Sequence, residues 1–200
     1  MSVETECKVH IQDPDGLKQR LTQAGAHISV TRVYEHNIRF EDAEHSLTAR
    51  DAILRLRRDN QVRLAYKGPA GDRIEGVSHR LELETTVGDL ETVDAILRHL
   101  GFVPYMVYEK YRTTYRFDDL AGVELVLDEM PFGNFIEVEG APDLIDVVLA
   151  RLDLADAHRI VVSYVELFER ILRHYQLDFG DLTFANFAGI QVDPIAFMAT

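Results

Sequence analysis

The sequence has a single cysteine, no tryptophan and far fewer basic than acidic residues, 21 against 34. One cysteine, Cys7, excludes an intrachain disulfide framework and a four-cysteine zinc site. The formal charge of −13 argues against duplex nucleic acid as a partner, because phosphate backbones are bound by net basic surfaces. No run of 18 apolar residues and no apolar signal core near Met1 occur, so neither a membrane partner nor a leader is predicted. These absences favour a cytoplasmic protein.

What the chain does have is alternation of apolar and polar residues, which is typical of half-buried strands. From Val3 to Ile11, the odd positions are mostly apolar and the even positions are Glu4, Glu6, Lys8 and His10. Further strands are predicted over residues 52–57, 62–67, 80–85, 107–117, 123–128 and 135–139, and residues 36–40 form one more candidate. Helices are predicted over 17–24, 90–100, 144–154 and 161–175, with a turn at 13–16.

The polar faces of these strands carry charges of both signs. They collect Glu4, Glu6, Lys8, Arg55, Arg57, Lys67, Arg80, Glu82, Glu84, Lys110, Arg112, Asp128, Glu137 and Glu139, and Arg63 and Glu124 have the same parity. On an open sheet such a face would simply be solvated. If helices cover the outside of a closed sheet, the charged faces meet inside, where about eight strands leave room for one small ligand. A charged interior is costly unless it is paired, solvated or filled by a charged ligand.

The residue types indicate which ligand this would be. Arginine and lysine suit phosphate oxygens, whereas clustered carboxylates suit a hard divalent cation. Alternation places Glu4 and Glu6 roughly 6.6 Å apart along their strand, at ~3.3 Å per residue, so both carboxylates approach one ion directly or through water. Lys8, one step further, would face a phosphate beside that ion. The pattern therefore favours a metal-bound polyphosphate.

The order of motifs resembles one known family, the CYTH superfamily of triphosphate tunnel metalloenzymes. The segment Glu4-Thr5-Glu6-Cys7-Lys8 resembles its ExExK signature. The later elements that resemble the family's motifs are Leu54–Arg57 (LRxR), Leu64–Pro69 (LTxKGP, with Ala65 where many relatives have threonine), Arg80–Glu84 (RxExE), Glu109–Arg112 (KxR), Leu127–Glu129 (LDE), Gly133–Glu139 (GxFxExE) and Ser163–Leu167 (SYxEL). The resemblance covers residues 3–170, so we predict a tunnel domain over 1–175 and an extension of unknown role over 176–200.

This resemblance implies an α+β fold: an eight-stranded antiparallel β-barrel, or tunnel, with a charged lumen and helices packed on the outside. It implies Mg²⁺ or Mn²⁺ as cofactor. The implied metal ligands are Glu4, Glu6, Asp128, Glu137 and Glu139. The implied triphosphate-binding residues are Lys8, Arg55, Arg57, Lys67, Arg80, Lys110 and Arg112. Glu4, Glu6 and Lys8 are the expected catalytic residues, and Glu82 and Glu84 line the tunnel without an assigned role.

Three functions stay open for such a lumen. Attack of water on the terminal phosphorus would make a metal-dependent triphosphatase, whereas attack of a ribose 3′-hydroxyl on the α-phosphorus would make a class IV adenylate cyclase. A non-catalytic polyphosphate- or nucleotide-binding module is the third. We favour hydrolysis of a triphosphate-containing small molecule, because the phosphate-binding residues are all present and no base-binding feature is visible. A monomer or a homodimer is expected.

For some residues outside the motifs, the sequence predicts a position more readily than a function. His10 shares the parity of Glu4 and is a candidate for a tunnel mouth, and Arg39 is a candidate for the lumen. The eight histidines show no zinc spacing and are expected on the surface or in structural positions. Cys7 lies on the apolar face of its strand, which favours packing over catalysis. Tyr108 and its neighbouring tyrosines are expected to pack in the sheet, although one of them could stack on a base.

Overall fold

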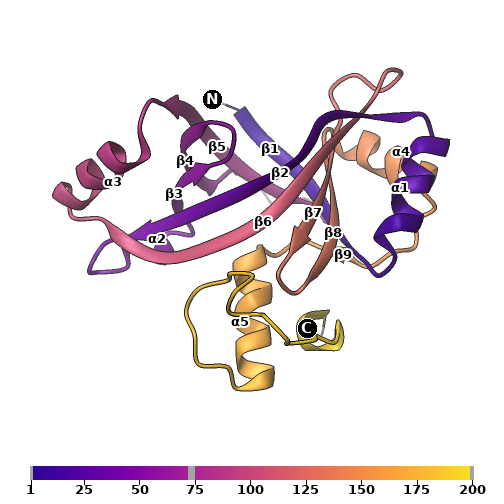
Figure 1. The fold of residues 1–200 in the computed structure, drawn as a ribbon. Helices are drawn as coiled ribbons and strands as arrows, with labels where there is room; N and C mark the ends of the chain where they lie inside the picture. The colour runs from indigo at the N-terminus through magenta and orange to yellow at the C-terminus, as the bar shows by residue number, and fades with distance from the viewer. Residues whose placement is uncertain (1, 72–74, 199–200) are drawn as a thin grey trace.

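The computed structural model describes residues 2–71 and 75–198 (Figure 1). The strands found there are β1 (Ser2–Ile11), β2 (Ala26–Glu41), β3 (Ile53–Arg58), β4 (Val62–Pro69), β5 (Ser78–Val87), β6 (Val103–Phe117), β7 (Glu124–Met130), β8 (Gly133–Glu139) and β9 (Arg159–Ile160). The helices are α1 (Pro14–Gln23), α2 (Ser46–Ala49), α3 (Leu90–His99), α4 (Pro142–Arg151), α5 (Tyr164–Tyr175) and α6 (Ile195–Met198).

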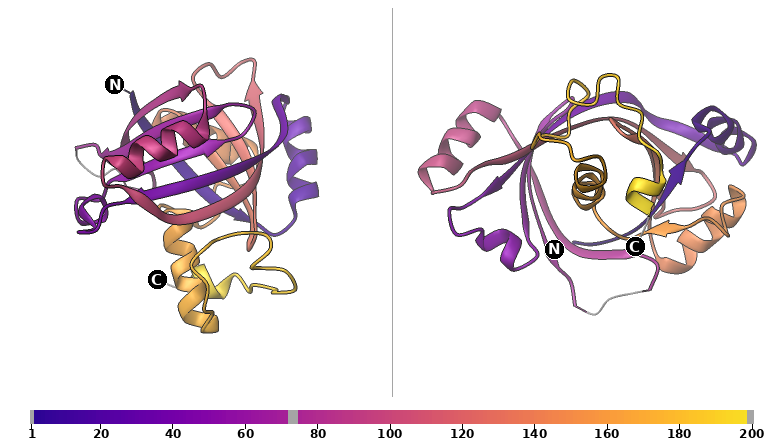
Figure 2. Two further views of the ribbon diagram at one scale, coloured as in Figure 1. Left: turned by 60° about the vertical axis from the view of Figure 1, so that its left-hand side comes forward. Right: turned by 90° about the horizontal axis from the view of Figure 1, so that it is seen from below.

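Eight strands form a closed antiparallel ring. Their order is β5–β4–β3–β2–β6–β7–β8–β1, and β1 also pairs with β5, with Glu4 opposite Arg80. The ring is visible when the molecule is viewed along its axis (Figure 2, right). The short strand β9 adds to β1 beside Lys8 and Val9. The predicted α+β fold with eight antiparallel strands around a lumen is thus confirmed.

Apolar residues on the outside of the ring form cores with the helices. Cys7, Val9 and Ile11 on β1 are buried in one cluster with residues of α1 and α4, including Leu21 and Leu149. A second cluster packs Leu97 of α3 against the outer side of β2 and β3. Because the alternating strands give their apolar side chains to these outer cores, their charged side chains are left to face one another inside.

Helix α5 takes a different position from α1, α3 and α4, since it lies at one end of the ring, where it is seen end-on within the outline of the ring (Figure 2, right). Its buried residues, including Tyr164 and Phe168, belong to a third cluster with Met106 and Phe135 of the strands. Residues 176–198, predicted as an extension, pack into the same cluster through Leu182, Phe187 and Phe197, among others. One end of the tunnel is therefore closed by α5 and the tail.

Two sequence predictions needed correction. Residues 13–16 were predicted as a turn, but α1 already begins at Pro14, and the side chain of Asp13 caps it by accepting a 2.9 Å hydrogen bond from the Gly16 amide. Proline fits this position because the first helical N–H groups have no partner in the helix. Strand β2 extends over Ala26–Glu41, well beyond the predicted 36–40. No helix in the described part of the chain is long and apolar enough to cross a membrane.

Candidate active site in the charged tunnel

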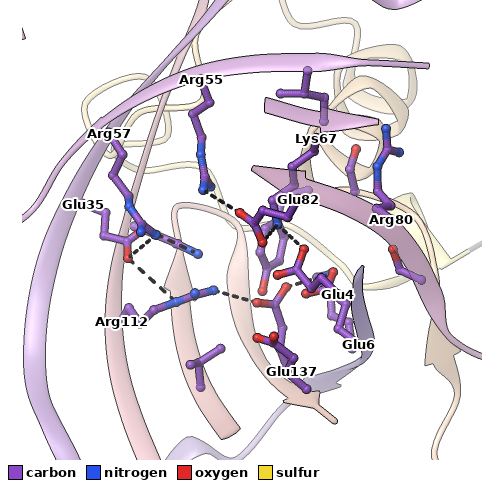
Figure 3. Close-up of a pocket in the computed structure, with 18 of the residues that line it drawn as sticks. Glu4, Glu6, Glu35, Arg55, Arg57, Lys67, Arg80, Glu82, Arg112 and Glu137 are labelled. Atoms are coloured by element: carbon purple, nitrogen blue, oxygen red, sulfur yellow. Dashed lines mark hydrogen bonds and ion pairs between the residues drawn. The ribbon is translucent and has the colours of Figure 1, made fainter. Parts of the chain in front are cut away.

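The lumen of the ring is a cavity of about 620 Å³. It is lined by side chains from the strands and by the start of α5, and Figure 3 shows ten of its charged residues pointing into one space. The predicted site residues that line it are Glu4, Glu6, Lys8, Arg55, Arg57, Lys67, Arg80, Glu82, Glu84, Lys110, Arg112, Glu137 and Glu139. Strand alternation alone therefore brought these residues of both signs together.

Carboxylates from β1 and β8 gather on one wall. Glu6 lies opposite Glu139 in the strand register, and Glu137 lies one alternation further along β8. Partial burial raises the pKa of Glu139 to about 7, helped by the neighbouring Glu4, Glu124 and Glu6. Burial also raises the pKa of Glu6, with repulsion from Glu137 as the next cause. Neighbouring glutamates contribute to both pKa shifts, so negative charge is concentrated at this wall.

Lys8 lies beside this wall and is almost completely buried. Its Nζ is 2.8 Å from Oε1 of Glu137 and 3.6 Å from Oε1 of Glu6, and it lies 4.6 Å from the centre of the Tyr164 ring. Burial alone would lower the pKa of Lys8, but Glu137 and Glu6 outweigh burial and raise it. Lys8 is therefore a fixed positive charge next to the carboxylates.

A second wall is basic and is organised by Glu35 of β2. Glu35 is 2% exposed, and its carboxylate oxygens lie 3.6 Å from Arg57, 3.6 Å from Lys110 and 3.9 Å from Arg112. Burial alone would raise the pKa of Glu35, but Lys110, Arg112 and Arg57 lower it to about 2. This one carboxylate thus lies within 4.0 Å of three cations at the lumen surface, and Figure 3 shows two of them, Arg57 and Arg112.

Asp128 of β7 lies behind the basic wall and is fully buried. Arg112 donates to both of its oxygens, at 2.7 and 2.6 Å, Lys110 donates at 2.9 Å and the Tyr164 hydroxyl donates at 3.0 Å. Arg112 also reaches Glu137 at 2.6 Å. Because both oxygens of Asp128 already accept from these groups, its position favours orienting the basic side chains over metal ligation.

The third wall comes from β3, β4 and β5. Arg55 lies 3.9 Å from Glu82 and 3.6 Å from Glu84, and it donates to the Tyr108 hydroxyl at 3.1 Å. Lys67 forms an ion pair with Glu4 of β1, on the other side of β5, and another with Glu82 of β5 at 3.3 Å. These contacts give Glu82 and Glu84 a place as counter-charges for the basic residues around them.

Arg80 lies 3.1 Å from Asp51, whose side chain is largely exposed. Its ion pair thus joins a lumen residue to the segment just before β3. Arg80 is therefore held from outside the lumen.

Sequence reasoning missed several residues of this cavity. Glu35, Tyr108, Tyr164 and Asp59 line it, and Arg39, which was only a candidate, lines it as well. The alternation of Glu35, Asn37 and Arg39 could have predicted the lumen side of β2. The intervening His36 is also polar, so this part of the strand has no continuous apolar face that would reveal the pattern. His10 is absent from the cavity lining; its ring packs edge-on against Phe135 and Phe197 at the closed end.

The carboxylates of the acidic wall are ligands that suit a divalent cation, although several of them already form ion pairs with lysines. Among residues 2–71 and 75–198, no three acidic, histidine or cysteine side chains already converge as a metal site. Lys67 holds Glu4, and Lys8 holds Glu137. Burial and neighbouring carboxylates nevertheless raise the pKa values of Glu6 and Glu139, although Lys8 lies 3.6 Å from Glu6, and a hard cation suits such a group of carboxylates.

A closed ring of eight antiparallel strands around a lumen lined by both signs of charge defines a tunnel protein with a charged interior. The CYTH domain family matches residues 2–155, and the chain belongs to this family. The chain is 27% identical over 174 residues to a Methanocaldococcus jannaschii protein named "Putative adenylate cyclase MJ0240", covering 82% of this chain and 98% of the relative.

Solved structures show the same fold. The PH1819 protein from Pyrococcus horikoshii matches with a TM-score of 0.69 and 26% identity, over 83% of this chain and 98% of that one. A Hippeastrum protein, HpAC1, described as a "putative adenylyl cyclase" that reveals a dominant triphosphatase activity, matches with a TM-score of 0.61 and 22% identity. That match covers 96% of this chain and 98% of the plant protein, and so extends beyond the region of the family match.

Proposed function

We propose that this protein is a divalent-metal-dependent phosphohydrolase that cleaves a triphosphate substrate inside the tunnel. The observation that carries the proposal is the separation of charge within one cavity: four carboxylates gather on β1 and β8, where Glu6 and Glu139 have raised pKa values, and they face a basic wall on β2, β3 and β6. A simple anion-binding protein would need only the basic wall, because carboxylates repel phosphate. A metal-bound triphosphate uses both walls.

In this proposal, Glu4, Glu6, Glu137 and Glu139 hold the metal. Mg²⁺ or Mn²⁺ bound there would neutralise phosphate charge and polarise the phosphoryl oxygens. Asp128 keeps its place behind the basic wall and orients Arg112 and Lys110.

The basic residues bind the phosphate chain: Lys8, Arg55, Arg57, Lys67, Arg80, Lys110 and Arg112. Water attacks the terminal phosphorus, the bond to the bridging oxygen breaks, and these cations stabilise the charge that develops on the leaving group. The fixed positive charge of Lys8 and the anchored Arg112 need no reorganisation during this step.

Adenylate cyclase activity is the second candidate, because the archaeal relative that is 27% identical carries that name. The two reactions differ only in the nucleophile and the phosphorus attacked. Hydrolysis is favoured because the described lining contains no aromatic slot that leaves room for a base: the Tyr108 hydroxyl accepts a hydrogen bond from Arg55, and Tyr164 packs over Lys8.

The test separates a catalyst from a binding protein. Glu4→Gln and Glu6→Gln remove carboxylate charge and keep side-chain size, so turnover of tripolyphosphate or ATP with Mg²⁺ should fall at least 100-fold, and EDTA should abolish it in the wild type. Affinity for tripolyphosphate without metal should stay equal or rise, since a repulsive charge is lost. Glu91→Gln, on the outer helix α3, is the matched control.

Two outcomes would contradict the proposal. A wild-type protein that binds tripolyphosphate but turns over no triphosphate with either cation would be a binding module. A protein whose turnover is the same in the Glu4 and Glu6 variants as in the wild type would place catalysis elsewhere.

A further inference from the structure

Arg39 differs from the other basic residues of the tunnel. Eight cations of the lining form ion pairs within 4.0 Å: Lys8, Arg55, Arg57, Arg63, Lys67, Arg80, Lys110 and Arg112. Arg39 lines the same cavity, and no carboxylate within residues 2–71 and 75–198 pairs with it at that distance. Burial lowers its pKa, so the charge is held at a cost that no protein carboxylate offsets directly.

The neighbours of Arg39 add to this cost. Arg39 lies directly opposite Arg55 in the register between β2 and β3, and both line the cavity. Like charges in this relation destabilise a sheet. The next lumen-side residue of β2, Asn37, is fully buried, and neither its amide nitrogen nor its amide oxygen has a hydrogen-bond partner. The Nε of Arg55 also lacks a partner. An arginine without an ion pair and polar atoms without hydrogen-bond partners therefore lie on adjacent positions of β2 and β3.

This place lies toward the end of the tunnel that α5 closes. The same cavity is lined by Val161 to Val165, where α5 begins, and Glu169 of α5 is among the groups that act on Arg39 electrostatically. Tyr108, which bonds to Arg55, belongs to the hydrophobic cluster formed with α5. A linear ligand that entered from the opposite mouth would meet Arg39 with its leading end.

We propose that Arg39, together with Arg55, forms an anion subsite at the closed end of the tunnel, which takes the leading phosphoryl group of a linear phosphate chain. The subsite rests on the proposed function, since it extends the same phosphate-binding lumen. It makes the protein a sensor of chain length: a chain of three or more phosphates reaches Arg39, whereas diphosphate held by the basic wall does not. Substrates with a free phosphate terminus are the class it selects.

The experiment measures binding in EDTA by calorimetry, with diphosphate, tripolyphosphate and tetrapolyphosphate as probes. Arg39→Gln should weaken tripolyphosphate and tetrapolyphosphate binding about tenfold or more, and diphosphate binding by less than threefold. Arg39→Lys should restore part of the loss, because it keeps the charge but not the bidentate geometry. Arg98→Gln on the outside of α3 is the matched arginine control.

A stability measurement separates this role from a structural one. Because Arg39 is partly buried without an ion pair, the ligand-free Arg39→Gln variant should melt at the same temperature as the wild type or higher. A lower melting temperature, an equal loss for all three probes, or no loss for any would each overturn the subsite. If the wild type turns over triphosphates but the three probes show no dependence on chain length at Arg39, the subsite fails and the proposed function stands. If binding depends on chain length but no triphosphate is turned over, the proposed function fails and the subsite stands.

Discussion

Glu35 provides a quantitative test of the electrostatic design, because one buried carboxylate faces three cations. Its pKa is lowered from 4.5 to about 2, and each unit of difference corresponds to about 1.36 kcal/mol, so its ionisation contributes about 3 kcal/mol at pH 7. Since the pKa in the folded state is the lower one, this contribution is complete above the unfolded-state pKa and is lost as the pH falls. At pH 3 less than half of the contribution remains.

Glu35→Gln keeps the size of the side chain and removes the charge. Urea unfolding of the wild type and the variant, from pH 7 down to pH 3, should show a gap in unfolding free energy of about 3 kcal/mol that shrinks by more than half over this range. The exposed Glu44→Gln is the control and should show a small gap. A gap below about 1 kcal/mol at pH 7, or one independent of pH, would refute the reasoning.

Two further predictions address the closed end and the acidic wall. Tyr164→Phe keeps the ring over Lys8 but removes the hydroxyl donor to Asp128, so the unfolding free energy should fall by about 1.5–3 kcal/mol in urea titrations; an unchanged value would show that α5 is not coupled to the lumen in this way. Mg²⁺ binding at pH 7 should release about half a proton, because Glu139 has a pKa of about 7 and must ionise to bind; calorimetry in two buffers measures the release, which Glu139→Gln should abolish. Release that persists in that variant would exclude Glu139 as its source.

The lumen was predictable from sequence because its strands separate apolar and charged residues by parity. In β1, Cys7 and Val9 face the outer core while Glu6 and Lys8 face inward, and a one-residue change of register would reverse every side chain. The same rule placed Arg55, Lys110 and Glu137 correctly in the cavity. Motif order then indicated the family to which the chain belongs.

Other parts of the site were not predictable because they depend on partners distant in sequence. Glu35 looks like an ordinary polar residue until β6 brings Lys110 beside it. Asp128 carries a carboxylate in a motif associated with metal, yet the pairing of β6 with β7 places Arg112 against it, and its contact with Tyr164 exists only after α5 has packed at the end of the ring. The tail from residue 176 has little periodicity, and its place is set by packing of residues such as Phe187 and Phe197.

The most direct test of the central claim is phosphorus-31 NMR of the purified protein incubated with Mg²⁺ and either tripolyphosphate or ATP. The account predicts orthophosphate from both, with diphosphate as the second product from tripolyphosphate and ADP as the second product from ATP. Cyclic AMP and diphosphate from ATP would contradict hydrolysis in favour of cyclisation. Unchanged spectra of both compounds, with Mg²⁺ or Mn²⁺, would contradict the claim that this tunnel is an active site.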